Sequence, residues 1–324
     1  MTGTTHAPAT GTQCNNASPM QALLDTIATL DYPTDAARVF HGRGGLHPGC
    51  EHLCLDVFPP VWLLTSFTPL EDDALASIAA ALERHWATLA TDGQPLNWVY
   101  QCRAAGHTTT RLMLGSVPEP HVVSERGTRY LVRLLQGQNH GLFLDMAEGR
   151  TWVAQQAAST PRLRVLNLFA YTCAFSVVAL QHGARQVINM DMSTGAMATG
   201  QKNHQLNGVA SGARFLVHDI FNSWGKITRM GPYDLIIVDP PSYQKGSFVA
   251  SKDYARLLRR LPDLLDADGR ALLCLNAPEL GAEFLQEQVR THAPQLRFVQ
   301  RLANPAAFAD VSEERALKAL VYSI

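Results

Sequence analysis

The run Asp239-Pro240-Pro241-Ser242-Tyr243 combines a carboxylate, a stiff turn and an aromatic ring. Proline pushes the residue before it towards an extended backbone, so Pro241 keeps Pro240 out of the helical region. Such a turn presents the carbonyl of Pro240 and the carboxylate of Asp239 to a nitrogen nucleophile, and Tyr243 can stack on a planar base. The sequence therefore predicts a catalytic site formed by Asp239, Pro240 and Tyr243. The alternative is an ordinary edge turn with a buried tyrosine.

Two further aspartates follow predicted strands where a nucleoside needs hydrogen-bond acceptors. Asp191 ends the second strand of a strand–helix series, about 20 residues past the first turn, where a carboxylate accepts hydrogen bonds from ribose hydroxyls. Asp219 follows the third strand and suits the exocyclic amine of adenine. Either one alone could be a turn or helix-cap aspartate, but four successive strand ends with polar residues argue against coincidence. These strand ends carry the predicted cofactor-binding residues Asn167, Phe169, Ala170, Tyr171, Thr172, Asp191, Met192, Ser193, Asp219, Ile220 and Asp239.

The first turn of this series, residues 170–175, contains no glycine. A dinucleotide site needs glycines there so that the backbone can approach a pyrophosphate, and NAD binding is therefore disfavoured. A nucleoside cofactor without phosphates tolerates this turn better. We predict that the cofactor is S-adenosyl-L-methionine.

The elements that would position these residues begin near residue 162, where apolar strands alternate with helices. We predict strands over 164–169, 187–190, 214–217, 235–238 and 271–275, with helices beginning at Phe175, Thr194 and Tyr254. Strand–helix alternation with continuously apolar strands is typical of a Rossmann-like, doubly wound parallel sheet buried on both faces. Ligands bind such α/β sheets at the carboxyl ends of the strands.

The first half has a different pattern. Helices are predicted over 20–30 and 70–89, and strands over 53–58, 61–67, 98–103 and 130–135. We therefore expect a disordered N-terminus over 1–19, a smaller α+β domain over 20–157 that recognises the substrate, and a methyltransferase-type α/β domain over 158–324.

Composition narrows the class of protein. The 324 residues are 46% hydrophobic and 17% charged with a net charge of −1, so the chain can bury a large core and has no overall basic excess. The six cysteines are scattered without the paired spacing of a zinc site, so we expect no metal and free thiols in a reducing cytoplasm. We see no signal peptide or membrane span and expect a cytoplasmic protein, either a monomer or a homodimer.

With these residues in view, the second half resembles the class I S-adenosylmethionine-dependent methyltransferases. Residues from about 38 to 324 resemble the bacterial 23S ribosomal RNA large-subunit methyltransferases that modify cytosine-5 or guanine-7. The resemblance implies an RNA substrate, most simply 23S ribosomal RNA, and cofactor contacts from Phe143, Asp145 and Asn207. The matching stretches are 41–56, 125–127, 137–145 with Arg150, 167–172 and 203–208.

Two positions depart from the family pattern. The glycine pair that follows the Tyr-Thr of the first turn is here Cys173-Ala174, and the cysteine side chain would crowd the methionine part of the cofactor or redirect the loop. The residue after Leu144-Asp145, usually Gln or Arg, is Met146.

A third comparison concerns the chemistry. Methylation of pyrimidine carbon-5 needs a thiolate that adds to carbon-6, and the cytosine-5 relatives carry it at the position of Ala277. Cys274 lies inside the predicted strand and is expected to pack as a small hydrophobic residue. Asn276 resembles the guanine-7 branch instead, and a nitrogen already carries a lone pair, so positioning suffices.

The leading hypothesis is therefore an enzyme, a methyltransferase acting on a base nitrogen in ribosomal RNA without a covalent cysteine intermediate. One alternative is a degenerate methyltransferase fold acting as a binding or scaffold protein, motivated by Cys173 and Met146. Another keeps the enzyme but gives it a protein or small-molecule substrate, which the neutral charge balance mildly favours.

Overall fold

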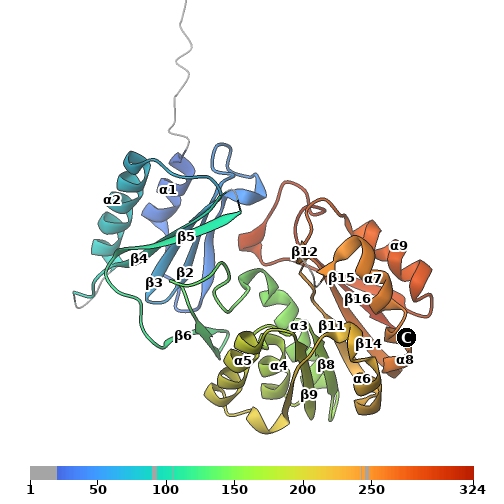
Figure 1. The fold of residues 1–324 in the computed structure, drawn as a ribbon. Coiled ribbons are helices and arrows are strands. Elements are labelled where there is room, and N and C mark those ends of the chain that lie inside the picture. The colour runs from blue at the N-terminus through green and yellow to red at the C-terminus, as the bar shows by residue number, and fades with distance from the viewer. Residues whose placement is uncertain (1–19, 90–92, 105, 242, 245–247) are drawn as a thin grey trace, which may run out of the picture.

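The computed structural model describes residues 20–89, 93–104, 106–241, 243–244 and 248–324. The two halves of the chain each build a sheet, and the two sheets lie side by side (Figure 1). No helix among these described residues is long and apolar enough to cross a membrane.

The N-terminal sheet has the order β1-β2-β3-β4-β5, and only its β3–β4 pair is parallel. Helices α1 and α2 cover one face through a core that includes Leu23, Ile27, Ile78 and Leu82. The bounds are α1 (Gln21–Thr29), β1 (Ala37–His41), β2 (Leu53–Phe58), β3 (Val61–Ser66), α2 (Asp72–Leu89), β4 (Asn97–Ala104) and β5 (His107–Leu114).

The C-terminal sheet has the order β10-β9-β8-β11-β14-β16-β15, parallel except for β16, which runs antiparallel to both neighbours. This confirms the predicted Rossmann-like α/β sheet. The strands are β8 (Arg164–Leu168), β9 (Gln186–Asp191), β10 (Ala213–Val217), β11 (Tyr233–Val238), β14 (Leu265–Leu275), β15 (Arg297–Leu302) and β16 (Lys318–Ser323).

Helices cover both faces of this sheet, because successive side chains of a strand point to opposite sides. Leu235 and Ile237 of β11 pack with α3 and α4, whereas Ile236 and Val238 pack with α7 and α9. The helices are α3 (Ala147–Ser159), α4 (Ala174–Gln181), α5 (Thr194–Leu206), α6 (Trp224–Met230), α7 (Ala250–Leu258), α8 (Leu261–Leu264) and α9 (Ala282–His292).

A hairpin joins the two halves. Strands β6 (His121–Glu125) and β7 (Thr128–Val132) pair only with each other. Their buried residues share one core with Leu63 of the N-terminal sheet and Val177 of α4. A second small hairpin, β12 (Tyr243–Gln244) and β13 (Phe248–Val249), follows β11.

The predicted division between residues 157 and 158 falls in the last turn of α3 and stays a prediction. Helix α3 packs on the C-terminal sheet through Trp152 and Val153. Its sequence gave no helical signal because Gly149 and the buried Arg150 interrupt the apolar face. The predicted strand over 130–135 is β7, which belongs to the joining hairpin rather than to the N-terminal sheet.

Candidate active site

Four parallel strands end side by side at one edge of the large sheet. Strands β10, β9, β8 and β11 are neighbours in that order, and Leu168 at the end of β8 pairs with Met190 of β9 and Val238 of β11. The residues after these strands therefore meet above the same edge, as the sequence predicts. A cavity of about 800 Å³ lies there, which we call the strand-end cavity. The predicted residues that line it are Phe143, Asp145, Phe169, Ala170, Tyr171, Thr172, Asp191, Met192, Ser193, Asp219, Ile220, Asp239 and Pro240.

Asp191 ties the first turn to the start of α5. Its Oδ2 accepts a hydrogen bond from the backbone N–H of Tyr171 at 2.9 Å, and its Oδ1 accepts one from the N–H of Ser193 at 2.8 Å. Each carboxylate oxygen retains a further lone pair. Because Asp191 also lines the cavity, it can accept hydrogen bonds from the hydroxyls of a ligand.

Asp219 is both a cap and a cavity residue. It caps the 3₁₀ turn η4 (Ile220–Asn222), where Oδ1 accepts the N–H of Phe221 at 2.8 Å and Oδ2 accepts Nδ2 of Asn222 at 2.6 Å. The capping role that the sequence allowed as an alternative is therefore real, and it fixes the carboxylate on the wall of the cavity.

The first turn takes the left-handed backbone conformation at three residues that are not glycine. The φ angles are 57° at Phe169, 47° at Tyr171 and 62° at Cys173. This conformation costs such residues about 1–2 kcal/mol each, and it persists where the surrounding structure holds it, commonly at binding sites. The missing glycines thus leave backbone strain beside the cavity.

The side chain of Cys173 does not enter the cavity. Cys173 is fully buried, and its Sγ lies 3.8 Å from Sδ of Met197 on α5. The space comes from Gly200 of α5, where an added Cβ would lie 2.6 Å from that Sγ. The thiol therefore does not crowd this cavity, because a glycine on the neighbouring helix accommodates it. The other expectation, that the cysteine redirects the loop, stays a prediction.

The lining suits a nucleoside cofactor that carries an amino-acid group. Helix α4 begins at Ala174 with no side-chain hydrogen bond capping it, and Ala174 and Phe175 both line the cavity. Free N–H groups at a helix start favour a carboxylate. The acceptor oxygens of Asp191 and Asp219 on the same cavity match the hydroxyl and amine groups of S-adenosylmethionine, and the N–H groups at the start of α4 match its carboxylate.

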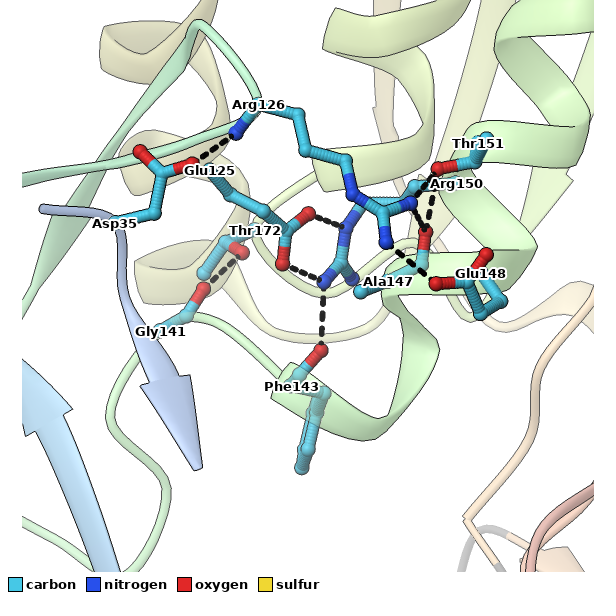
Figure 2. Close-up of polar contacts among 10 residues, drawn as sticks. All are labelled: Asp35, Glu125, Arg126, Gly141, Phe143, Ala147, Glu148, Arg150, Thr151 and Thr172. Atoms are coloured by element: carbon cyan, nitrogen blue, oxygen red, sulfur yellow. Dashed lines mark hydrogen bonds and ion pairs between the residues drawn. The ribbon is translucent and has the colours of Figure 1, made fainter. Parts of the chain in front are cut away.

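Arg150, the one arginine among the described residues of the lining, is already engaged (Figure 2). Its Nε and Nη2 donate to the two carboxylate oxygens of Glu125, each at 2.6 Å, and Nη2 also donates to the carbonyl of Phe143 at 2.9 Å. Both side chains are buried. The guanidinium therefore holds the loop at Phe143 in place, with its charge balanced by Glu125.

Asp239 follows β11 and lies in the cavity near a second carboxyl group. Burial, followed by repulsion from Asp145, raises the pKa of Asp239 to about 7, and attraction to Arg150 offsets part of the rise. Burial also raises the pKa of Asp145, against the attraction of Arg38 and Arg150. A carboxyl group with a pKa near 7 can both accept and release a proton at neutral pH.

Two predicted site residues, Asn167 and Asn207, are not brought into this cavity. Asn167 is buried within the sheet, where its Nδ2 donates to Oδ1 of Asn189 at 2.9 Å. Asn207 ends α5 and bonds through its amide to the backbone of Arg129 in β7. The side chain of Tyr243 lies outside the described residues, as does Ser242.

The lining also contains residues that were not predicted to bind the cofactor. Asn276 follows β14, so a fifth strand end could have been included by the same rule. Leu317 comes directly before the antiparallel strand β16, and nothing in its local sequence marks it. Met146 is buried against the α3 core and also lines the cavity.

A second cavity, of about 620 Å³, lies between the two halves of the chain. Its walls come from β1, β2 and β4 of the N-terminal sheet and from the segment 304–317 of the C-terminal half, and we call it the interdomain cavity. It shares wall residues with the strand-end cavity, so the two spaces are adjacent. The shared residues are Asn139, Gly141, Phe143, Asp145, Tyr171, Asn276 and Leu317.

Comparison with known proteins bears on this geometry. The family model described as S-adenosylmethionine-dependent methyltransferase matches residues 37–323. A structure from Streptococcus mutans described as an S-adenosylmethionine-dependent methyltransferase superposes with a TM-score of 0.78 at 25% identity, covering 90% of this chain and 75% of that one.

Two curated relatives share the name ribosomal RNA large subunit methyltransferase I. The protein from Aeromonas salmonicida is 35% identical over 140 residues, which are 42% of this chain and 35% of the relative. The protein from Erwinia tasmaniensis is 30% identical over 226 residues, which are 69% of this chain and 55% of the relative. The matched region thus spans about a third to a half of the length of these relatives.

Proposed function

Because this chain belongs to the S-adenosylmethionine-dependent methyltransferases, we propose that it methylates a base nitrogen in RNA, most simply ribosomal RNA. The observation that carries the proposal is Asp239, a half-buried carboxylate on a double-proline turn that lines the strand-end cavity and whose pKa is raised to about 7. When bound, S-adenosylmethionine supplies a methyl group made electrophilic by a positively charged sulphur.

A nitrogen acceptor fits the thiol positions in the part of the chain that the structure describes. The described residues that line the two cavities include no cysteine. Cys274 is fully buried in β14, and burial raises the pKa of its thiol well above the usual range. Ala277, at the position where cytosine-5 relatives place the nucleophile, is buried, and its carbonyl accepts a hydrogen bond from Nζ of Lys318 at 2.7 Å. Carbon-5 methylation lacks the nucleophile that it needs.

Asp239 has the role of proton acceptor in this proposal. An acceptor nitrogen that carries hydrogen would form the new bond to the methyl carbon through its lone pair as the carbon–sulphur bond breaks, which leaves one proton too many on that nitrogen. The ionised Asp239 takes this proton, and the carbonyl of Pro240 accepts a hydrogen bond from the remaining N–H. Because the pKa of Asp239 is raised to about 7, a substantial fraction of its carboxyl groups is ionised at neutral pH and can take up this proton.

Two relatives are named ribosomal RNA large subunit methyltransferase I, and these names support ribosomal RNA as the substrate proposed for this chain. A cytoplasmic location follows if the substrate is ribosomal RNA. The features that favoured a scaffold instead do not obstruct the strand-end cavity, because Cys173 packs towards Gly200 and Met146 is part of the α3 core.

The test is nucleoside mass spectrometry of ribosomal RNA from a deletion strain and from its parent. We expect one N-methylated nucleoside to be missing in the deletion strain and restored by the wild-type chain but not by Asp239→Ala. Unchanged methylated nucleosides would contradict RNA methylation, and a missing 5-methylcytidine would contradict the nitrogen acceptor.

A further inference from the structure

The interdomain cavity contains arginines that have no carboxylate partner. Of the four that line it, Arg38 forms a bidentate pair with Asp56 at 2.8 and 3.0 Å. Among the described residues, Arg43, Arg103 and Arg315 form no salt bridge. Three guanidinium groups therefore carry positive charge that the protein itself does not neutralise by direct contact.

The side chain of Arg103 is oriented by hydrogen bonds to neighbouring residues. Its Nε donates to Oε1 of Gln101 at 2.5 Å, and its Nη2 donates to the carbonyl of Gln138 at 2.7 Å. Gln101 is fully buried, and its own amide donates to Oγ1 of Thr110 and to the carbonyl of Gly137, each at 3.1 Å. The guanidinium is thus positioned before any ligand arrives, which reduces the entropy lost on binding.

Among the described residues, each hydrogen-bond partner of Arg103 is neutral. Besides the two carbonyl oxygens, Nη2 approaches Nε2 of His140 at 3.4 Å. Burial lowers the pKa of His140, and its Nδ1 lies 3.1 Å from the carbonyl of Arg133, so Nδ1 carries the proton and Nε2 accepts. A partly buried cation with only neutral partners is an anion-binding group, and a guanidinium suits the oxygens of a phosphate.

None of the described carboxylates that line this cavity forms a salt bridge with Arg103. Asp56 is paired with Arg38, and Asp310 accepts the backbone N–H of Ser312 at 2.9 Å. Glu51 is exposed to solvent. Asp145 belongs to the wall shared with the strand-end cavity.

An aromatic surface lies on that shared wall. The ring of Phe143 is 41% exposed and lies 5.2 Å from the ring of Tyr171, tilted by 49°. Exposed aromatic rings stack on nucleobases. A ligand with both a phosphate and a planar base therefore matches Arg103 and Phe143, which both line this cavity.

We propose that the interdomain cavity binds the acceptor nucleotide, with Arg103 contacting its phosphate and Phe143 stacking on its base at the wall shared with the strand-end cavity. The inference rests on the proposed function, because it assigns the acceptor site of that reaction. It gives the N-terminal half a direct part in the site, since Arg103 lies on β4.

The test is isothermal titration of the full chain with each nucleoside 5′-monophosphate and with the matching nucleoside, both in the presence of the cofactor product S-adenosylhomocysteine. At least one monophosphate should bind about tenfold more tightly than its nucleoside, the gain of one charged hydrogen-bonded contact. Arg103→Gln should abolish that preference, Arg103→Lys should keep part of it, and neither should change the affinity for S-adenosylhomocysteine.

Arg111→Gln is the matched control, because Arg111 is exposed on the neighbouring strand β5 and lines neither cavity. Its monophosphate affinity should equal that of the wild type. Equal binding of monophosphate and nucleoside, or an intact preference in Arg103→Gln, would overturn the proposal. So would the absence of any nucleotide binding in a chain that binds S-adenosylhomocysteine, which would favour a protein acceptor. Because no methylation is measured, this outcome is separate from failure of the proposed function in the deletion strain.

Discussion

Asp239 is the residue on which the proposed chemistry depends. Its carboxyl group must be ionised to accept a proton, and its pKa is raised to about 7 by burial and by Asp145. Below this pKa the group is already protonated, so activity is lost as the pH falls and reaches a plateau above the pKa. The midpoint of this loss should lie at about pH 7.

We therefore expect kcat to fall about tenfold per pH unit on the acid side of this midpoint. The measurement is a set of initial rates across the pH range with saturating cofactor and RNA. Rates that do not change between about pH 5 and pH 8 would show that Asp239 does not accept the proton.

Asp191 gives a prediction about the cofactor alone. Asp191→Ala removes the proposed acceptor for ribose hydroxyls and the bonds to the Tyr171 and Ser193 amides. Charge-assisted hydrogen bonds of this kind contribute about 1.5–3 kcal/mol each, so affinity for S-adenosylmethionine should fall by at least about tenfold. Calorimetric titration measures this directly.

Asp234→Ala is the control for that variant. Asp234 lies near the opposite end of β11 and also accepts a backbone N–H, that of Arg164 at 2.6 Å. It lines neither cavity, so its loss should leave the cofactor affinity unchanged. Equal effects of the two substitutions would mean that Asp191 acts only through stability.

At the scale of elements, the first turn packs closely on α5. Gly200 of α5 leaves the space that the side chain of Cys173 occupies. Gly200→Ala would place a methyl group 2.6 Å from Sγ of Cys173, and overpacking of this kind costs about 1–3 kcal/mol. Cys173→Gly removes both the obstacle and a left-handed cysteine. The double variant should therefore regain the stability that Gly200→Ala loses.

Urea unfolding of the wild type, both single variants and the double variant measures this coupling. Gly195→Ala is the control on the same helix, because an added Cβ there meets nothing within 4 Å. It should not destabilise the chain. Additive effects of Cys173→Gly and Gly200→Ala would contradict the contact.

The pair of Glu125 and Arg150 connects the β6–β7 hairpin, α3 and the loop at Phe143 (Figure 2). Glu125→Gln leaves the buried Arg150 without its counter-charge, which should cost about 3–5 kcal/mol. It should also weaken cofactor binding, because the loop at Phe143 loses its anchor.

The adjacent pair of Arg126 and Glu148 is exposed at the surface, so Glu148→Gln should cost less than about 1 kcal/mol. Chemical denaturation of the two variants compares them. A similar loss in both would mean that burial does not set the strength of the Glu125 pair.

For the whole molecule, the parallel sheet and its strand-end cavity were predictable from sequence because both depend on local patterns. Runs such as 235–238 are continuously apolar, and the position of Asp191 follows from counting past the first turn. The interdomain cavity was not predictable, because it joins Arg38 and Arg103 to residues near 304–317 that are distant in the chain.

Some elements escaped prediction for physical reasons. Strand β5 is mostly exposed on the sheet edge and carries three consecutive threonines, so it lacks the alternation of a half-buried strand. The accommodation of Cys173 by Gly200 is a tertiary contact between residues 27 positions apart, which the spacing of motifs does not reveal.

The most direct measurement combines purified chain, ribosomal RNA from the deletion strain and S-adenosylmethionine with a tritiated methyl group. Digestion of the RNA and chromatography then identify the labelled nucleoside. We predict label on a ring or exocyclic nitrogen of one base, absent with Asp239→Ala. Label in 5-methylcytidine, or no label in RNA from a chain that binds the cofactor, would contradict a nitrogen-directed RNA methyltransferase.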